Sequence, residues 1–146
     1  MATNLVYRNT DSQNRVETLA ATYQSGEPVL SLSGEAAVTI TASGDATISD
    51  STSFPPYTIS GIPNGGVGLV GKQVTLAFDG TWEFPAADFT GITVNSPQGT
   101  AVNIINATNL FTNAATSGSI TAYGYVDFPP DYDKTRGMIP VRIGTR

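Results

Sequence analysis

Few side chains in this sequence could carry out catalysis. Histidine and cysteine are both absent, so acid–base chemistry would fall to carboxylates, tyrosines, or the lysines Lys72 and Lys134. The chain has neither a glycine-rich phosphate-binding loop nor a Gly-x-Ser-x-Gly turn around a nucleophilic serine. A hydrolase that uses two carboxylates across a cleft stays open as an alternative. The sequence favours a protein that is not an enzyme, with no catalytic residue and no cofactor.

Three aspartates near the C-terminus form the single acidic cluster of the chain: Asp127, Asp131 and Asp133. Their carboxylates could offer oxygen ligands to Ca²⁺, but the Gly and Glu of a calcium-binding EF-hand loop are missing. Lys134 and Arg136 lie beside them. We therefore expect a solvated loop with local ion pairs and no metal site, while ion binding by this cluster stays open.

Aromatic residues offer a second kind of chemistry, the stacking of sugar rings. A carbohydrate-binding module would use such a platform, and it remains an alternative. We favour the simpler interpretation that Trp82 lies in the core and that the tyrosines pack inside the protein or at a subunit interface. The candidates are Trp82, Tyr123, Tyr125, Phe128 and Tyr132.

Composition indicates a β-protein of one domain. Hydrophobic residues make up 40% of the chain and charged residues 13%, against about a quarter charged in typical soluble domains. The chain is rich in the residue types that favour strands. Its length of 146 residues fits a single domain.

Charge and hydropathy argue against two classes of partner. The net charge is −5, the isoelectric point is about 4.4, and no basic run occurs, which argues against binding to nucleic acid. No apolar run reaches the roughly 18 residues of a membrane span. The N-terminus lacks the basic head and apolar stretch of a signal peptide, so we expect synthesis in the cytoplasm without secretion.

The stretch Val74–Pro85 carries the clearest structural signal, a hairpin folded at Asp79-Gly80. Its large apolar residues share one face only if the loop has an odd length, because side chains alternate along a strand. We therefore predict a β-bulge with Gly80 at positive φ. A two-residue turn with both faces covered is the alternative. The expected core hairpin consists of Val74, Leu76, Phe78, Gly80, Trp82 and Phe84.

Further short strands with frequent turn signals predict an all-β sandwich or small barrel with little or no helix. Along Ile120–Val126, alternation places Tyr123 and Tyr125 on the face opposite Val126. Pro140 lacks an N–H group, so we expect the last strand at a sheet edge or with a bulge.

The chain divides into an arm and one domain. Residues 1–14 are polar apart from Leu5, Val6 and Tyr7; this short apolar patch either folds back onto its own domain or is donated to a partner. Residues 15–146 form a single β domain. Within it, the region 33–65 is rich in small and polar residues and is expected to be an exposed insertion.

Six short motifs, taken in order over most of residues 15–146, resemble capsid decoration (cement) proteins of tailed bacteriophages. Each is a turn or strand signature common to many β-proteins, so the resemblance rests on their order, and residues 33–65 depart from the pattern. The motifs are Gly26-Glu27-Pro28-Val29, Gly66-Val67-Gly68-Leu69, the Val74–Pro85 stretch, Gly91-Ile92-Thr93-Val94, Gly124-Tyr125-Val126 and Val141-Arg142-Ile143.

The resemblance implies a small β-barrel or β-tulip-like domain that binds the major capsid protein as a homotrimer. It would lie on the outer capsid surface of the virion and stabilise the shell against the pressure of packaged DNA, with no active site. On this hypothesis Leu5, Val6 and Tyr7 form a capsid-binding arm. Another virion β-module, such as a tail or spike component, is the alternative. Candidates for the trimer interface are Pro129, Pro130, Ile139, Pro140 and Val141.

Overall fold

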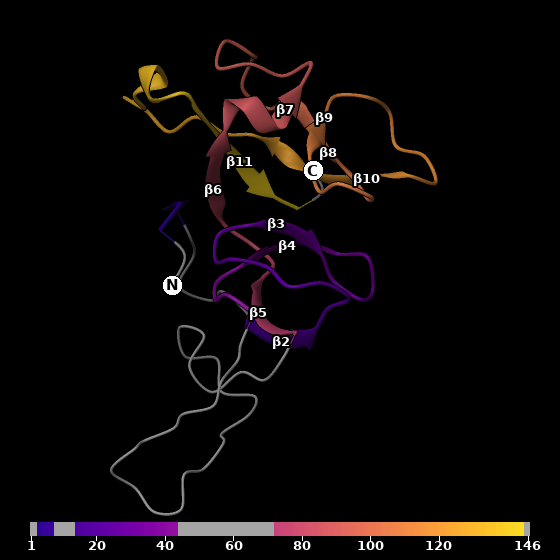
Figure 1. The fold of residues 1–146 in the computed structure, drawn as a ribbon. Coiled ribbons are helices and arrows are strands. Elements are labelled where there is room, and N and C mark those ends of the chain that lie inside the picture. Colours follow the sequence, from indigo (N-terminus) through magenta and orange to yellow (C-terminus); the bar gives the residue numbers. More distant parts are fainter. Residues whose placement is uncertain (1–2, 8–13, 44–71, 145–146) are drawn as a thin grey trace, which may run out of the picture.

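The computed structural model describes residues 3–7, 14–43 and 72–144 (Figure 1). In this part of the chain the regular structure consists of β-strands and two short 3-10 helices, Ala86–Asp88 and Lys134–Arg136. The predicted all-β class with little helix is confirmed. The strands form two open sheets, of seven and four strands, and these sheets do not close into a barrel.

The seven-stranded sheet holds most of the C-terminal half of the chain and appears in the upper part of Figure 1. All its neighbouring strands are antiparallel except β7 and β9, which are parallel. From edge to edge it contains β1 (Leu5–Tyr7), β6 (Thr81–Pro85), β11 (Met138–Ile143), β10 (Ile120–Val126), β8 (Ala101–Ile105), β9 (Phe111–Thr112) and β7 (Phe89–Thr90).

The four-stranded sheet lies below the larger one in Figure 1 and is antiparallel throughout. Its β4 falls inside the region 33–65 that was expected to be an exposed insertion, yet Ala37, Val38 and Thr39 are buried. That expectation is wrong for β4, and residues 44–65 lie outside the described part of the chain. The strand order is β2 (Asn14–Thr18), β5 (Gln73–Ala77), β4 (Ala36–Thr39) and β3 (Pro28–Leu30).

The predicted hairpin at Asp79-Gly80 is wrong. β5 pairs with β2 and β4, whereas β6 pairs with β1 and β11, so Asp79-Gly80 is a corner between the two sheets. Gly80 has the predicted positive φ, at 97°. The indole N–H of Trp82 donates to the Asp79 carbonyl over 2.8 Å and fixes this corner. The argument from alternating faces assumed that one face is exposed. It failed because Thr81 and its polar neighbours are buried as well.

The larger of two buried hydrophobic clusters joins the two sheets. Val38 and Ala77 of the four-stranded sheet belong to the same buried cluster as the apolar residues of β6, β8, β10 and β11. At its centre the Phe111 ring lies 4.9 Å from that of Phe84 and 5.0 Å from that of Tyr123, between centroids. The Tyr123 hydroxyl donates to a carbonyl of β4, at Ala37, over 2.7 Å.

The predicted faces of β10 are wrong because the strand contains a bulge. Ala122 lies opposite Asn103 and Gly124 lies opposite Val102, so Tyr123 is an extra residue without a partner in the pairing register. The bulge reverses the alternation. Tyr123 and Val126 are therefore both buried in the core.

The expectation that Pro140 marks an edge strand is also wrong, since β11 lies between β6 and β10. Ile143 donates its N–H to the carbonyl of Gly80, the residue before β6, and alternation along the strand points position 140 toward β10. There the N–H of Asp127 donates to the Pro140 carbonyl over 3.0 Å, and the pairing of β11 with β10 stops one residue short of this position, at Val126 and Val141. Pro140 therefore costs the sheet one bond at the end of the β10 ladder.

Candidate assembly surface

The N-terminal strand β1 lies at the edge of the seven-stranded sheet, antiparallel to β6. Leu5 pairs with Trp82 and Tyr7 with Thr81. Of the two alternatives for this segment, the described structure matches the one in which it folds back onto its own domain. Leu5 and Tyr7 nevertheless remain 46% and 52% exposed. The strand therefore presents large apolar side chains on a backbone that the domain holds in place.

Asn4 fastens this strand to β6 and to the turn that precedes β3. Its side-chain amide donates to the Gly26 and Glu83 carbonyls, each over 3.0 Å. Its own carbonyl accepts the N–H of Glu83 over 2.9 Å. Gly26, at φ 82°, permits the close approach, because a Cβ there would lie 2.7 Å from the Asn4 Oδ1. No sequence signal pointed to Asn4, since one asparagine in a polar segment has no recognisable pattern.

A cleft of about 640 Å³ adjoins this fastening point, where the β6 edge meets the loops of the four-stranded sheet. The exposed side chain of Leu110 lines it together with Pro28 and Phe84. The N–H of Glu83 donates toward β1. Pro85, two residues later in β6, has no N–H group. Pro85 therefore limits strand pairing at this edge to the length of β1.

The cleft also has an electrostatic character. Carboxylates of Glu27 and Asp88 are among its walls, and none of its described lining residues is basic. The described lining therefore gives the cleft a negative charge.

The loop that connects β10 to β11 covers the outer side of β6. Glu83 is buried there and accepts hydrogen bonds from the Tyr132 hydroxyl and from Arg136, whose Nη1 is 3.0 Å away. Burial and the hydrogen bond to Glu83 raise the pKa of Tyr132 well above its usual range. The Lys134 ammonium lies 4.4 Å above the Phe128 ring. These contacts make the loop a fixed part of the domain.

The three aspartates of the predicted acidic cluster have separate roles. Asp127 accepts from Thr81 over 2.8 Å and from Gln98 over 2.7 Å. Asp133 accepts from the hydroxyl and amide of Thr135, which lower the pKa of its carboxyl below 3.8. Asp131 is exposed, at φ 62°. Among the described residues no three acidic side chains are placed to hold a metal ion together.

Most of the predicted trimer-interface residues are in the wrong place for that role. Ile139, Pro140 and Val141 are buried within the single chain, so their side chains are not available to another subunit. Pro129 is half-buried and Pro130 is exposed. Alternation alone could not distinguish a core strand from an interface strand, because both bury one apolar face.

The proposed sugar-stacking platform loses its two central members. Trp82 and Tyr123 are 2% and 1% exposed, so neither can stack on a ligand. The rings of Phe128 and Tyr132 pack against each other, with centroids 5.5 Å apart. Tyr125 is half-buried.

None of the helices in the described ranges is long and apolar enough to cross a membrane. Comparison of the chain with protein-family models, with curated proteins and with solved structures gives no match.

Proposed function

We propose that this protein is a structural virion component that binds the outer surface of a phage capsid as a homotrimer and stabilises the shell. The observation that carries the proposal is β1, an edge strand with exposed Leu5 and Tyr7 side chains held in place by Asn4. The major capsid protein is the partner that the order of the sequence motifs suggests.

The physical basis is adhesion. A strand that is already fixed loses little conformational entropy when a partner covers it, so burial of Leu5 and Tyr7 translates efficiently into affinity. Each copy needs only a modest contact, because linked subunits bind a lattice by avidity. Such a protein acts mechanically and needs no reactive group.

The polar residues of the described surface support a structural role. Glu83 and Asp127 are engaged in hydrogen bonds that hold the β10–β11 loop against β6. Arg15 is paired with Glu17 and Glu35. These hydrogen bonds and ion pairs hold loops in place, as a rigid adhesive domain requires.

Co-sedimentation with undecorated capsids tests the proposal. A variant that combines Leu5→Asp and Tyr7→Asp should bind capsids at least about tenfold more weakly, because two exposed apolar contacts become charged. Both side chains are exposed, so we expect the fold to persist, as circular dichroism would verify.

The matched control carries the same added charge at the other end of the seven-stranded sheet. Thr90→Asp changes an exposed residue of β7 and Ala114→Asp an exposed residue just after β9, and this double variant should bind as the parent does. Equal binding by the β1 variant and its parent would refute the assignment of this surface, and a parent that ignores capsids would refute the function.

A further inference from the structure

The turn between β3 and β4 displays the most exposed of the large apolar side chains in the described residues. Leu32 is 71% exposed. It lies on the four-stranded sheet, whereas β1 belongs to the larger sheet. An isolated surface leucine requires no explanation, so the question is whether the turn is built to present it.

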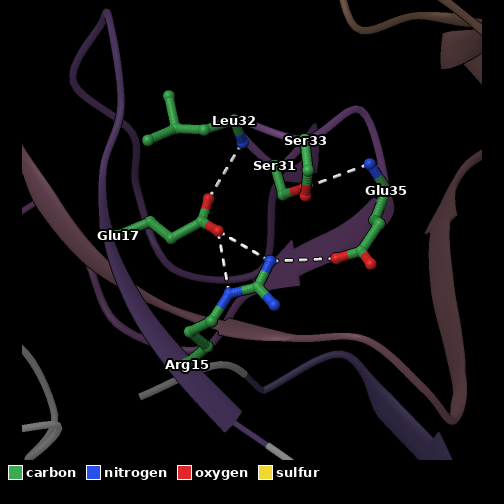
Figure 2. A network of polar contacts seen from close by, with 6 residues as sticks. All are labelled: Arg15, Glu17, Ser31, Leu32, Ser33 and Glu35. Atoms are coloured by element: carbon green, nitrogen blue, oxygen red, sulfur yellow. Dashed lines mark hydrogen bonds and ion pairs between the residues drawn. The ribbon is translucent and has the colours of Figure 1, made fainter.

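Polar contacts fix this turn from two sides (Figure 2). Glu17 of β2 accepts the N–H of Leu32 over 3.0 Å, and the Arg15 Nε donates to the same carboxylate over 2.8 Å. The Arg15 guanidinium also pairs with Glu35 over 2.9 Å. Within the turn, the Ser31 hydroxyl accepts the N–H of Glu35 over 3.0 Å. Leu32 is therefore presented on a backbone whose position is set before any partner arrives.

A cavity of about 500 Å³ lies beside the same turn, at the mouth between the two sheets. Ala36 and Phe78 line it from the smaller sheet, and Ala122 and Ile143 from the larger one. This volume is in the range of pockets that accept a side chain or small ligand.

Leu32 does not line the cavity, although Gly34 and Glu35, two and three residues later, do. Glu35 borders the cavity, and Figure 2 shows the Leu32 side chain pointing away from Glu35 across the polar network. The turn itself, residues 31–34, carries no charge. Arg15 and Glu35 at the cavity rim are already paired with each other.

We propose that Leu32 of one copy of this protein inserts into the cavity of the next copy, in a head-to-tail contact. Both halves of the contact lie on one chain, and an uncharged turn that meets a paired rim leaves no charge buried alone. A contact between two different surfaces closes into a ring when the rotation per subunit allows it. The inference deepens the proposed function, because it supplies the contact within the oligomer.

Disulfide trapping tests the contact cleanly, because the chain has no cysteine of its own. Leu32→Cys and Ala122→Cys are prepared as separate proteins, mixed and oxidised. The ratio of mixed dimer to homodimer should be at least about fivefold higher than random pairing gives. Only the mixed pair brings the two sulfurs within bonding distance. Ala114→Cys, at an exposed position that lines neither the cleft nor the cavity, replaces Leu32→Cys as the control, and its mixture with Ala122→Cys should give the random proportion.

Sedimentation equilibrium provides the second measurement. Leu32→Asp should weaken self-association by roughly tenfold or more, while Ala114→Asp, beside the other sheet, should leave it unchanged. A random proportion of mixed disulfides, or equal association by Leu32→Asp and its parent, would overturn the inference. If the parent binds capsids but the cysteine variants form disulfides in the random proportion, only this contact is refuted. Preferential mixed disulfides without capsid binding would refute only the proposed function.

Discussion

Gly124 lies where β10 and β11 approach too closely for a side chain. A Cβ at this position would be 1.9 Å from the backbone carbonyl oxygen of Arg142, and backbone cannot rotate aside as a flexible side chain can. Gly124→Ala should therefore lower the free energy of unfolding by roughly 3 kcal/mol, at the upper end for overpacking. Urea unfolding measures the loss.

Gly118 offers a matched control for that substitution. A Cβ added there meets no atom within 4 Å, so Gly118→Ala should change the free energy of unfolding by less than about 0.5 kcal/mol. If both variants lose the same stability, the close approach at Gly124 is not the cause.

Asp133 predicts a pH dependence with a definite sign. Hydrogen bonds from the Thr135 hydroxyl and amide lower the pKa of its carboxyl below 3.8. A lowered pKa in the folded state means that the carboxylate stabilises the fold above pH 3.8 and that this contribution disappears as the pH falls through the lowered value. Asp133→Asn should therefore be less stable than the parent at neutral pH, with a difference that shrinks in acid.

The nearby exposed residue Asp131 serves as the comparison, because asparagine also tolerates its φ of 62°. Urea unfolding of Asp131→Asn should follow the parent at neutral pH. A stability gap for Asp133→Asn that is as large in acid as at neutral pH would contradict the assigned hydrogen bonds.

Positive φ at Gly80 could be predicted from the sequence, whereas the role of Asn4 could not. Asp-Gly pairs favour a chain reversal whatever lies beyond them, so the local conformation follows from residue type. Asn4 acts through carbonyls at Gly26 and Glu83, which are distant in the sequence. The contact to Glu83 uses only its carbonyl, so the identity of that residue carries no trace of the contact.

At the scale of elements, β1 depends on that single side chain. Asn4→Ala removes two hydrogen bonds to the Gly26 and Glu83 carbonyls, at a cost of about 1–2 kcal/mol. Because β1 is an edge strand of three residues, this loss should open β1 before the rest of the sheet. Hydrogen exchange at the Val6 amide should accelerate about tenfold or more.

Thr3→Ala alters the adjacent exposed residue and should leave exchange in β1 as it is in the parent. Protection of the β11 amides should change no more than the global stability does in either variant. Faster exchange across the whole sheet after Asn4→Ala would show that β1 does not open on its own.

The positions of the strands were easier to predict from the sequence than their pairing partners and buried faces. The segments around β5, β6, β10 and β11 were all expected as strands, but the pairing of β5 with β6 and the faces of β10 were wrong. A bulge such as that at Tyr123 inverts every side chain beyond it. Pro140 misled because its missing N–H matters only on the side where β10 ends. Both effects depend on the neighbouring strand.

At the scale of the whole molecule, low charge and many β-formers indicated the fold class, and tertiary packing decided the rest. The division into two sheets was not predictable, because residues 74–77 and 81–84, on either side of the corner between the sheets, are buried on both faces. A candidate site built from exposed residues was equally unpredictable from the sequence. Leu32 is exposed in a turn between two strands, and no periodicity in the sequence predicts the exposure of a turn residue.

The shared core predicts that the two sheets unfold together. Val38 and Ala77 of the smaller sheet belong to the same buried cluster as Trp82 of the larger one, and the Tyr123 hydroxyl donates to a carbonyl of β4, so the opening of either sheet disrupts the cluster that they share. Trp82 fluorescence, which reports the larger sheet, and far-ultraviolet circular dichroism, which reports both, should give coincident urea midpoints. The slowest amides of β5 and β11 should then exchange with the same free energy of opening, which is the global one. Separate midpoints, or β5 amides that exchange well before those of β11, would mean that the smaller sheet opens as an independent unit on a preformed larger one.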